Sequence, residues 1–250
     1  MLSDATASSA GFVPYGGQHA AAVGAALVLV AAFVAAGRGL RDTAAEAHLR
    51  RAFVAFALAH CVFYNLWWSW RGLDLQQGLP LHPCDFVQVL GPLALLIGTR
   101  WMRAVLYFAA FALTTQAFIQ PALSLGHASM VFWSFWIAHS IILACAAYDL
   151  AVLGFRPGWG DLARACAAGA VYVVLIMPLN LVLGSNYGFI GDPAPPQTMP
   201  PLVEALGAWP GRVAAMLALA ALGFAILLLP WLWIARLRAG TAGRAGAAAR

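Results

Sequence analysis

The stretch QHAAAVGAALVLVAAFVAAG, residues 18–37, contains no charged side chain and decides the fold class. A helix crosses the hydrocarbon core of a bilayer with about 20 residues, and this stretch has that length. Six further apolar stretches of similar length follow it. The sequence therefore predicts an all-α membrane bundle of seven transmembrane helices. The predicted spans are residues 18–37, 51–70, 80–98, 101–119, 129–150, 164–184 and 213–235.

The composition agrees with a membrane bundle. Apolar residues make up 63% of the chain and charged residues 9%. A soluble domain of this size needs more charge to cover its surface, whereas helices that face lipid need none. The loops between the spans are too short for a separate soluble domain. We therefore expect one bundle over residues 1–236, followed by a disordered cytoplasmic tail over residues 237–250 that is rich in alanine, glycine and arginine.

The basic residues predict the orientation, and all 14 of them are arginines. Only Arg71 and Arg212 lie in the second, fourth and sixth connections, and the other arginines lie in the alternate set. Short cytoplasmic loops collect basic residues, so the amino terminus is predicted outside and the carboxyl terminus inside. The segment before Gln18 has no basic residue, so we expect no cleaved signal peptide. This pattern suits a multi-pass protein of a bacterial cell membrane, with lipids as partners and no nucleic acid.

Polar side chains gather toward the outer ends of the predicted spans. Such groups are costly in hydrocarbon and are usually kept for function. The third span carries four of them on one broad side, His82, Cys84, Asp85 and Gln88. Comparable groups in other spans or next to them are His60, Gln116, His139, Asn180 and Asn186. The inner half of the spans is expected to have few such groups.

A cysteine with a histidine in reach is the minimum for a thiolate nucleophile, because the imidazole can accept the thiol proton. Cys84 and His139 are the candidates for this pair. Asp85 could orient a histidine, and Gln116 or Asn180 could donate to a developing oxyanion. Packing is the competing interpretation, since cysteine often fills space and polar side chains often join helices. Counted from the expected starts of their spans, Cys84 lies roughly 6 Å deep and His139 roughly 15 Å deep.

Metal and cofactor sites receive little support from the sequence. His60, His82, Cys84, Asp85 and His139 are competent ligands, but they show none of the tight spacings of known zinc motifs. We therefore predict no metal and no cofactor. The chain contains no lysine, which excludes a retinal or pyridoxal Schiff base.

Several motifs occur in an order that resembles the YwaF-like family of bacterial integral membrane proteins. They are Leu-Pro-Leu-His-Pro-Cys-Asp at 79–85, Thr-Gln-Ala-Phe-Ile-Gln-Pro at 115–121, Phe-Trp-Ile-Ala-His-Ser at 135–140, Gly-Ser-Asn-Tyr-Gly-Phe at 184–189 and Leu-Gly-Ala-Trp-Pro at 206–210. More distantly, the pattern is similar to eukaryotic multi-pass acyltransferases that remodel ether phospholipids through a cysteine. It is also similar to androgen-induced membrane hydrolases of fatty-acid esters, which use a threonine and a histidine.

These resemblances imply a lipid substrate, with Cys84 as the nucleophile and His139 as its partner. The motif departs from that of the eukaryotic acyltransferases, where a histidine directly follows the cysteine. Here Asp85 follows the cysteine, and the nearby histidine is His82. The first hypothesis is thus a thiol-dependent lipid acyltransferase or hydrolase. The alternatives are a transporter or sensor that binds a small ligand in the same outer pocket, and an assembly factor whose polar residues serve helix packing.

Overall fold

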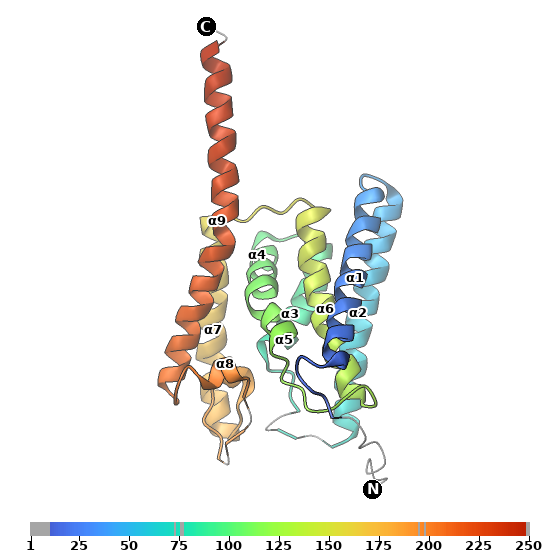
Figure 1. The fold of residues 1–250 in the computed structure, drawn as a ribbon, viewed down its shortest axis with the longest axis vertical. Coiled ribbons are helices and arrows are strands. Elements are labelled where there is room, and N and C mark those ends of the chain that lie inside the picture. The colour runs from blue at the N-terminus through green and yellow to red at the C-terminus, as the bar shows by residue number, and fades with distance from the viewer. Residues whose placement is uncertain (1–10, 73, 76–77, 195, 198, 249–250) are drawn as a thin grey trace.

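The computed structural model describes residues 11–248 except residues 73, 76–77, 195 and 198, and these residues form helices and loops without a β-strand (Figure 1). The elements of the first half are α1 (Gly17–Gly39), α2 (Ala44–Trp70), α3 (Pro83–Ile97), α4 (Arg100–Phe108), the π-helix η2 (Ala109–Thr114) and α5 (Thr115–Ile119). Those of the second half are α6 (Met130–Ala151), α7 (Trp159–Leu183), the 3-10 turn η3 (Tyr187–Phe189), α8 (Pro201–Glu204) and α9 (Gly211–Ala248).

The helices have the lengths of a polytopic membrane protein. In the described part of the chain, six helices are long and apolar enough to cross a membrane, with α4, η2 and α5 joined as Arg100–Ile119. The third predicted span is shorter than expected, because α3 has only 15 residues. At 1.5 Å per residue it rises about 22 Å, less than the hydrocarbon core of about 30 Å. The structure thus supports six long spans and leaves α3 as a shorter apolar helix.

Two helices begin earlier than the sequence predicts, because polar side chains cap their first turns. The Thr43 hydroxyl accepts the backbone N–H of Glu46, which starts α2 at Ala44 rather than at residue 51. The Asp161 carboxylate accepts the backbone N–H of Gly158, which starts α7 at Trp159 rather than at residue 164. Both caps satisfy backbone donors that a helix start leaves free. The predicted spans cover only the apolar residues that cross the hydrocarbon core, and these two helices extend beyond that core.

The carboxyl end also differs from the prediction. α9 continues as helix to Ala248, whereas the sequence predicts a disordered tail from residue 237 onward. The segment is rich in alanine and arginine, and both residues favour helix. Figure 1 shows this end of α9 extending beyond the other helices.

The helix α6 forms the centre of the bundle, and more than half of its most apolar window is buried. It packs against α1 on one side and α3 on another, while α2 packs on α3 and α7 on α4. Figure 1 shows α1 and α2 together at one flank, and α7 and α9 together at the opposite flank. The outward faces of the flanking helices carry large exposed apolar side chains, as a lipid environment requires.

The connections between helices divide over two ends of the bundle. Residues 40–43, 98–99 and 152–158 lie at one end, which we name the inner end after the predicted orientation. Residues 11–16, 120–129 and 184–210, without residues 195 and 198, lie at the other end, named the outer end. The polar residues that the sequence singles out belong mainly to the outer half.

Candidate functional site

The outer end of α3 is fixed by its own first turn. Pro83 occupies the first helical position, where its missing N–H and restricted φ suit a helix start. One carboxylate oxygen of Asp85 accepts the backbone N–H of His82 at 2.9 Å. Asp85 therefore caps this turn, and in the described residues it forms no hydrogen bond with an imidazole. The predicted role of orienting a histidine is not the one that Asp85 has here.

A close contact between α3 and α6 sets their relative depth. Gly91 lets the helices approach, because a Cβ atom at this position would lie only 3.2 Å from Cys145 Cβ. Both helices run from the outer to the inner end, and six residues before this contact lie Asp85 on α3 and His139 on α6. Cys84 is one residue further, about 1.5 Å along an ideal helix. Counted back from this contact along ideal helices, Cys84 and His139 differ in depth by about 1.5 Å, compared with roughly 9 Å when counted along the predicted spans.

The side of α3 on which Cys84 lies also follows from this contact. Seven residues make almost two helical turns, so Cys84 lies on the same face as Gly91, the face that packs on α6. Its side chain is partly buried and packs against the central apolar cluster. Among the residues that the structure describes, the Cys84 thiol makes no hydrogen bond to either ring nitrogen of His139. Cys84 and His139 lie at similar depths on neighbouring helices, but His139 lies about 120° around α6 from the Cys145 face, and no hydrogen bond joins the two described side chains.

The hydrogen bonds of His139 define its tautomer. Its Nδ1 lies 2.7 Å from the carbonyl oxygen of Phe135, and only a protonated nitrogen can donate to a carbonyl. The neutral ring therefore carries its lone pair on Nε2, which is the arrangement that a general base needs. The ring is buried and lies against the Phe135 ring, with centroids 4.2 Å apart. His139 is thus oriented by its own helix rather than by a carboxylate.

The other predicted histidine of α3 faces the outer loop. His82 Nδ1 accepts the backbone N–H of Gly188 at 3.3 Å, so its proton is on Nε2. Its ring lies edge-on to Tyr187, with centroids 5.4 Å apart. His82 therefore presents an N–H at Nε2, whereas His139 presents a lone pair at Nε2.

Gln88 and His60 form a second pair one turn deeper. The Gln88 side chain is 4% exposed, and its amide nitrogen lies 3.1 Å from His60 Nδ1 across the α2–α3 interface. His60 Nε2 is buried and has no partner in the described part of the chain. The pair joins two helices, which supports the packing interpretation for Gln88, and it leaves one donor of His60 unsatisfied.

The amide residues predicted as oxyanion donors have other partners or another place. The buried Asn180 side chain donates to the Tyr187 carbonyl at 2.9 Å and accepts from the Tyr187 N–H at 2.9 Å. It also accepts from the Ser185 hydroxyl at 2.8 Å. Asn186 accepts the N–H of Gly191 at 3.0 Å. Gln116 is exposed on α5. Asn180 and Asn186 therefore shape the outer loop, and Gln116 does not join them.

Two tyrosines that sequence reasoning missed tie the outer loop and α7 to the segment that precedes α3. The Tyr187 hydroxyl donates to the Leu75 carbonyl at 3.0 Å and accepts the Leu79 N–H at 2.9 Å. The Tyr172 hydroxyl donates to the Leu81 carbonyl at 2.8 Å. Burial raises the pKa of the Tyr187 phenol above its ordinary value, so it stays a neutral donor. An isolated tyrosine in a Gly-Ser-Asn-Tyr-Gly sequence gives no signal of these distant partners.

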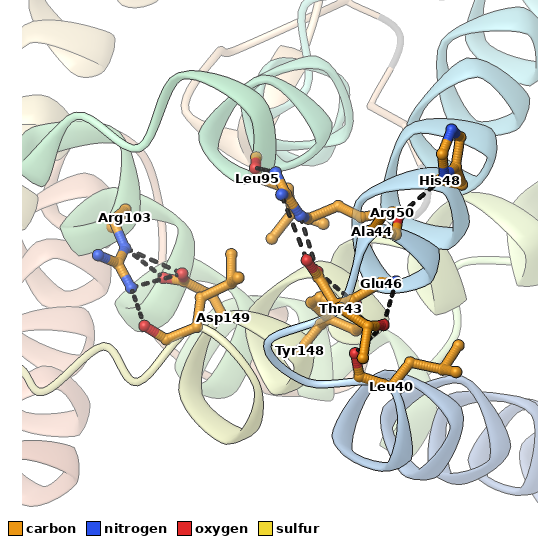
Figure 2. A network of polar contacts seen from close by, with 11 residues as sticks. Leu40, Thr43, Ala44, Glu46, His48, Arg50, Leu95, Arg103, Tyr148 and Asp149 are labelled. Atoms are coloured by element: carbon orange, nitrogen blue, oxygen red, sulfur yellow. Dashed lines mark hydrogen bonds and ion pairs between the residues drawn. The ribbon is translucent and has the colours of Figure 1, made fainter.

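The inner end carries a network of charged residues that the sequence analysis did not foresee (Figure 2). The Arg103 guanidinium pairs with Asp149 at 2.8 Å and joins α4 to α6. Arg50 pairs with Glu46 at 2.9 Å and also donates to the Leu95 carbonyl at 2.7 Å. The Tyr148 hydroxyl donates to Glu46 at 2.7 Å. The expectation of an inner half with few polar groups is wrong, because arginines assigned to orientation also pair with buried acids.

The same residues offer little to a metal ion. Within the described ranges, no three His, Cys, Asp or Glu side chains come together in a way that could hold one. The four cysteines are free thiols and form no disulfide. The absence of a metal and of a cofactor stays a prediction.

Comparisons with known proteins give one family. The model of the TMEM164 family matches residues 14–228, a range that includes Cys84, His139 and the outer loop. No curated protein and no solved structure matches the chain.

Proposed function

The chain belongs to the TMEM164 family of membrane proteins, and we propose that it is a thiol-dependent enzyme that transfers or hydrolyses the fatty acyl groups of membrane lipids. The observation that carries the proposal is the shared depth of Cys84 and His139 on facing helices, which follows from the Gly91–Cys145 contact. A site within the outer half of the bundle suits a lipid, because an acyl chain can enter it from the bilayer without leaving hydrocarbon.

The tautomer of His139 supports the first chemical step. Its Nε2 lone pair takes the proton of the Cys84 thiol, and the thiolate attacks the carbonyl carbon of an acyl ester. The carbon–oxygen bond of the ester then breaks, the leaving alkoxide takes the proton from His139, and a thioester remains on Cys84. Water or a lysolipid hydroxyl attacks this thioester in the second step and releases the thiol. His82, protonated on Nε2, is the candidate donor to the oxyanion, in place of Asn180 and Gln116.

A chemical labelling experiment tests the pair. Purified protein is incubated with a phospholipid whose acyl chain carries an alkyne, and hydroxylamine-sensitive label on the protein is measured. Wild type and Cys61→Ser should label equally, since Cys61 is a partly buried thiol of the neighbouring α2. Cys84→Ala should remove the label, and His139→Ala should slow its formation by about 10²–10⁴-fold. Equal labelling of Cys84→Ala and wild type would falsify the proposal.

The missing hydrogen bond between Cys84 and His139 favours a second candidate function, a transporter or sensor that binds a small ligand without covalent chemistry. In that case the histidines and Gln88 bind the ligand, and Cys84 fills space beside them. Ligand-induced protection of the outer loop from proteolysis would then survive Cys84→Ala and be lost in His139→Ala. The acyl-enzyme proposal instead expects His139→Ala to slow acyl labelling and not to change this protection.

We also propose that α3 is embedded in the bilayer, which gives seven passes with the amino terminus outside in the cell membrane. The arginine distribution and the apolar sequence of α3 support this topology. Alkaline phosphatase fused after residue 126 or residue 206 should be active, and the same enzyme fused after residue 98 or residue 157 should be inactive. Activity of the fusion after residue 98 would reverse the assignment of α3.

A further inference from the structure

A groove lies on the side of α3 that faces away from Cys84. It has a volume of about 390 Å³ and is bounded by α2, α3 and the start of α4. The residues that line it are Cys61, Asn65, Pro80, Asp85, Phe86, Val89, Leu90, Leu93, Trp101 and Met102. It is separate from the proposed acyl-transfer pair, because Val89 and Leu93 lie on the α3 face opposite Gly91.

The groove is polar at its outer end and apolar along its length. Asp85 and Asn65 line the outer end, and Leu93 lies eight residues deeper than Asp85, roughly 12 Å along an ideal helix. Between them, the side chains of Phe86 and Val89 are 46% and 38% exposed on the outer surface of the bundle. The Phe86 ring meets Tyr172 of α7 edge-on, with centroids 5.8 Å apart, and the remaining exposed surface of Phe86 and Val89 is open to the hydrocarbon of a bilayer.

The carboxylate at the outer end has no cation from the protein. One oxygen of Asp85 accepts the His82 backbone N–H, and no arginine or histidine nitrogen of the described chain lies within ion-pair distance of either oxygen. The buried acids of the inner end differ, since Asp149 and Asp161 each pair with arginine. Asp85 is partly buried at the outer end of the groove, so its carboxylate can accept a cationic partner from a bound molecule.

We propose that this groove binds one phospholipid of the outer leaflet, with a cationic headgroup nitrogen beside Asp85 and one acyl chain along Val89 and Leu93. The occupant is a zwitterionic lipid rather than an anionic one, because the site offers a negative charge and no arginine. The groove faces the bilayer, where lipids are the available ligands. This inference does not depend on the acyl-transfer proposal, since the groove and Cys84 lie on different faces of α3.

Native mass spectrometry of the purified full chain tests the headgroup preference. The protein is equilibrated in micelles with equal amounts of phosphatidylcholine and phosphatidylglycerol that carry identical acyl chains. Wild type should retain phosphatidylcholine over phosphatidylglycerol by about fivefold, the ratio that one partly exposed ion pair supports. Asp85→Asn should bring the ratio near unity and still cap α3, because asparagine keeps the acceptor oxygen. Asp192→Asn removes an exposed acid of the outer loop as the matched control and should leave the ratio unchanged.

A second pair of variants tests the acyl-chain part of the groove. Val89→Trp should fill it and reduce retention of both lipids, whereas Val174→Trp changes an exposed residue of α7 outside the groove and should have no effect. An unchanged lipid ratio in Asp85→Asn, or equal retention by the two tryptophan variants, would overturn the proposal. Loss of acyl labelling in Cys84→Ala with normal lipid retention would separate this site from the proposed enzyme chemistry.

Discussion

Polar side chains have different partners at the inner and outer ends of the bundle. At the inner end, the buried acids pair with arginines from other helices or from the next turn, as in Arg100–Asp161 at 2.6 Å and Arg103–Asp149 at 2.8 Å. At the outer end, the polar side chains bond mainly to backbone groups. Charges satisfied by one another fix helices in place, whereas groups such as His139 Nε2 keep capacity for a substrate. The comparison indicates that the inner end stabilises the bundle, whereas the described residues of the outer half keep hydrogen-bonding groups without side-chain partners.

The largest effect is expected at Asp161, because this fully buried side chain accepts from three donor residues at the inner end. Arg100, Arg164 and the Gly158 backbone N–H all donate to it. Asp161→Ala removes these hydrogen bonds to a charged acceptor, each worth about 1.5–3 kcal/mol, and should lower the free energy of unfolding by about 3 kcal/mol. Reversible unfolding in mixed detergent micelles measures the change.

The matched control for this prediction is Asp192→Ala, which removes an exposed acid of the outer loop. Its effect should stay within about 0.5 kcal/mol, as for most surface substitutions. Equal destabilisation by Asp161→Ala and Asp192→Ala would mean that the ion pairs of the inner end do not stabilise the bundle.

A smaller effect is expected at Asn180, the centre of the outer loop. Asn180→Ala leaves the Tyr187 backbone and the Ser185 hydroxyl without buried partners, and should cost about 1–3 kcal/mol. Asn65→Ala is its control, because that amide bonds only within α2, to the Cys61 carbonyl and thiol. If Asn180 instead serves catalysis, the Asn180→Ala protein should be as stable as wild type but lose acyl labelling. That result would contradict the structural role assigned to Asn180.

Part of this architecture could be predicted from the sequence. Apolar stretches locate the six long helices, because hydrocarbon thickness sets the minimum length of a span, but they do not locate every helix end. The caps at Thr43 and Asp161 lie beyond that signal, so α2 and α7 start earlier than predicted. The π-helix Ala109–Thr114 has no signal in the sequence, since its residues would suit an α-helix equally well.

The candidate site was less predictable than the helices. The sequence indicates which residue types gather at the outer end, but depth depends on where each helix begins. The similar depth counted for Cys84 and His139 depends on the Gly91–Cys145 contact, and nothing in the sequence marks Gly91 as a contact with Cys145. Asp85 and Asn180 also bond to backbone groups, and the residue types do not reveal which backbone groups lie near them.

The α1–α6 contact near the inner end provides a test with its own control. A Cβ atom at Gly37 would lie 2.3 Å from the Tyr148 ring, so Gly37→Ala should destabilise the bundle by about 1–3 kcal/mol. Gly24 lies in the same helix with nothing within 4 Å of an added Cβ. Gly24→Ala should therefore stabilise by about 0.5–1 kcal/mol, because alanine favours helix more than glycine. If Gly37→Ala and Gly24→Ala change the free energy of unfolding in the same direction, the close packing of α1 on α6 is contradicted.

The smallest effect is expected at Tyr148, which tests whether the inner network acts as one unit. Tyr148→Phe removes the hydrogen bond to Glu46 but keeps the ring that stacks on Phe33, with centroids 4.5 Å apart. Arg50 still pairs with Glu46 in this variant, so no buried charge is left alone and the cost should be about 1 kcal/mol. Tyr15→Phe changes an exposed tyrosine at the outer end and should cost nothing measurable. If Tyr148→Phe lowers the free energy of unfolding as much as Asp161→Ala does, the hydrogen bonds and ion pairs of the inner end strengthen one another. They would then stabilise the bundle cooperatively rather than as separate pairs.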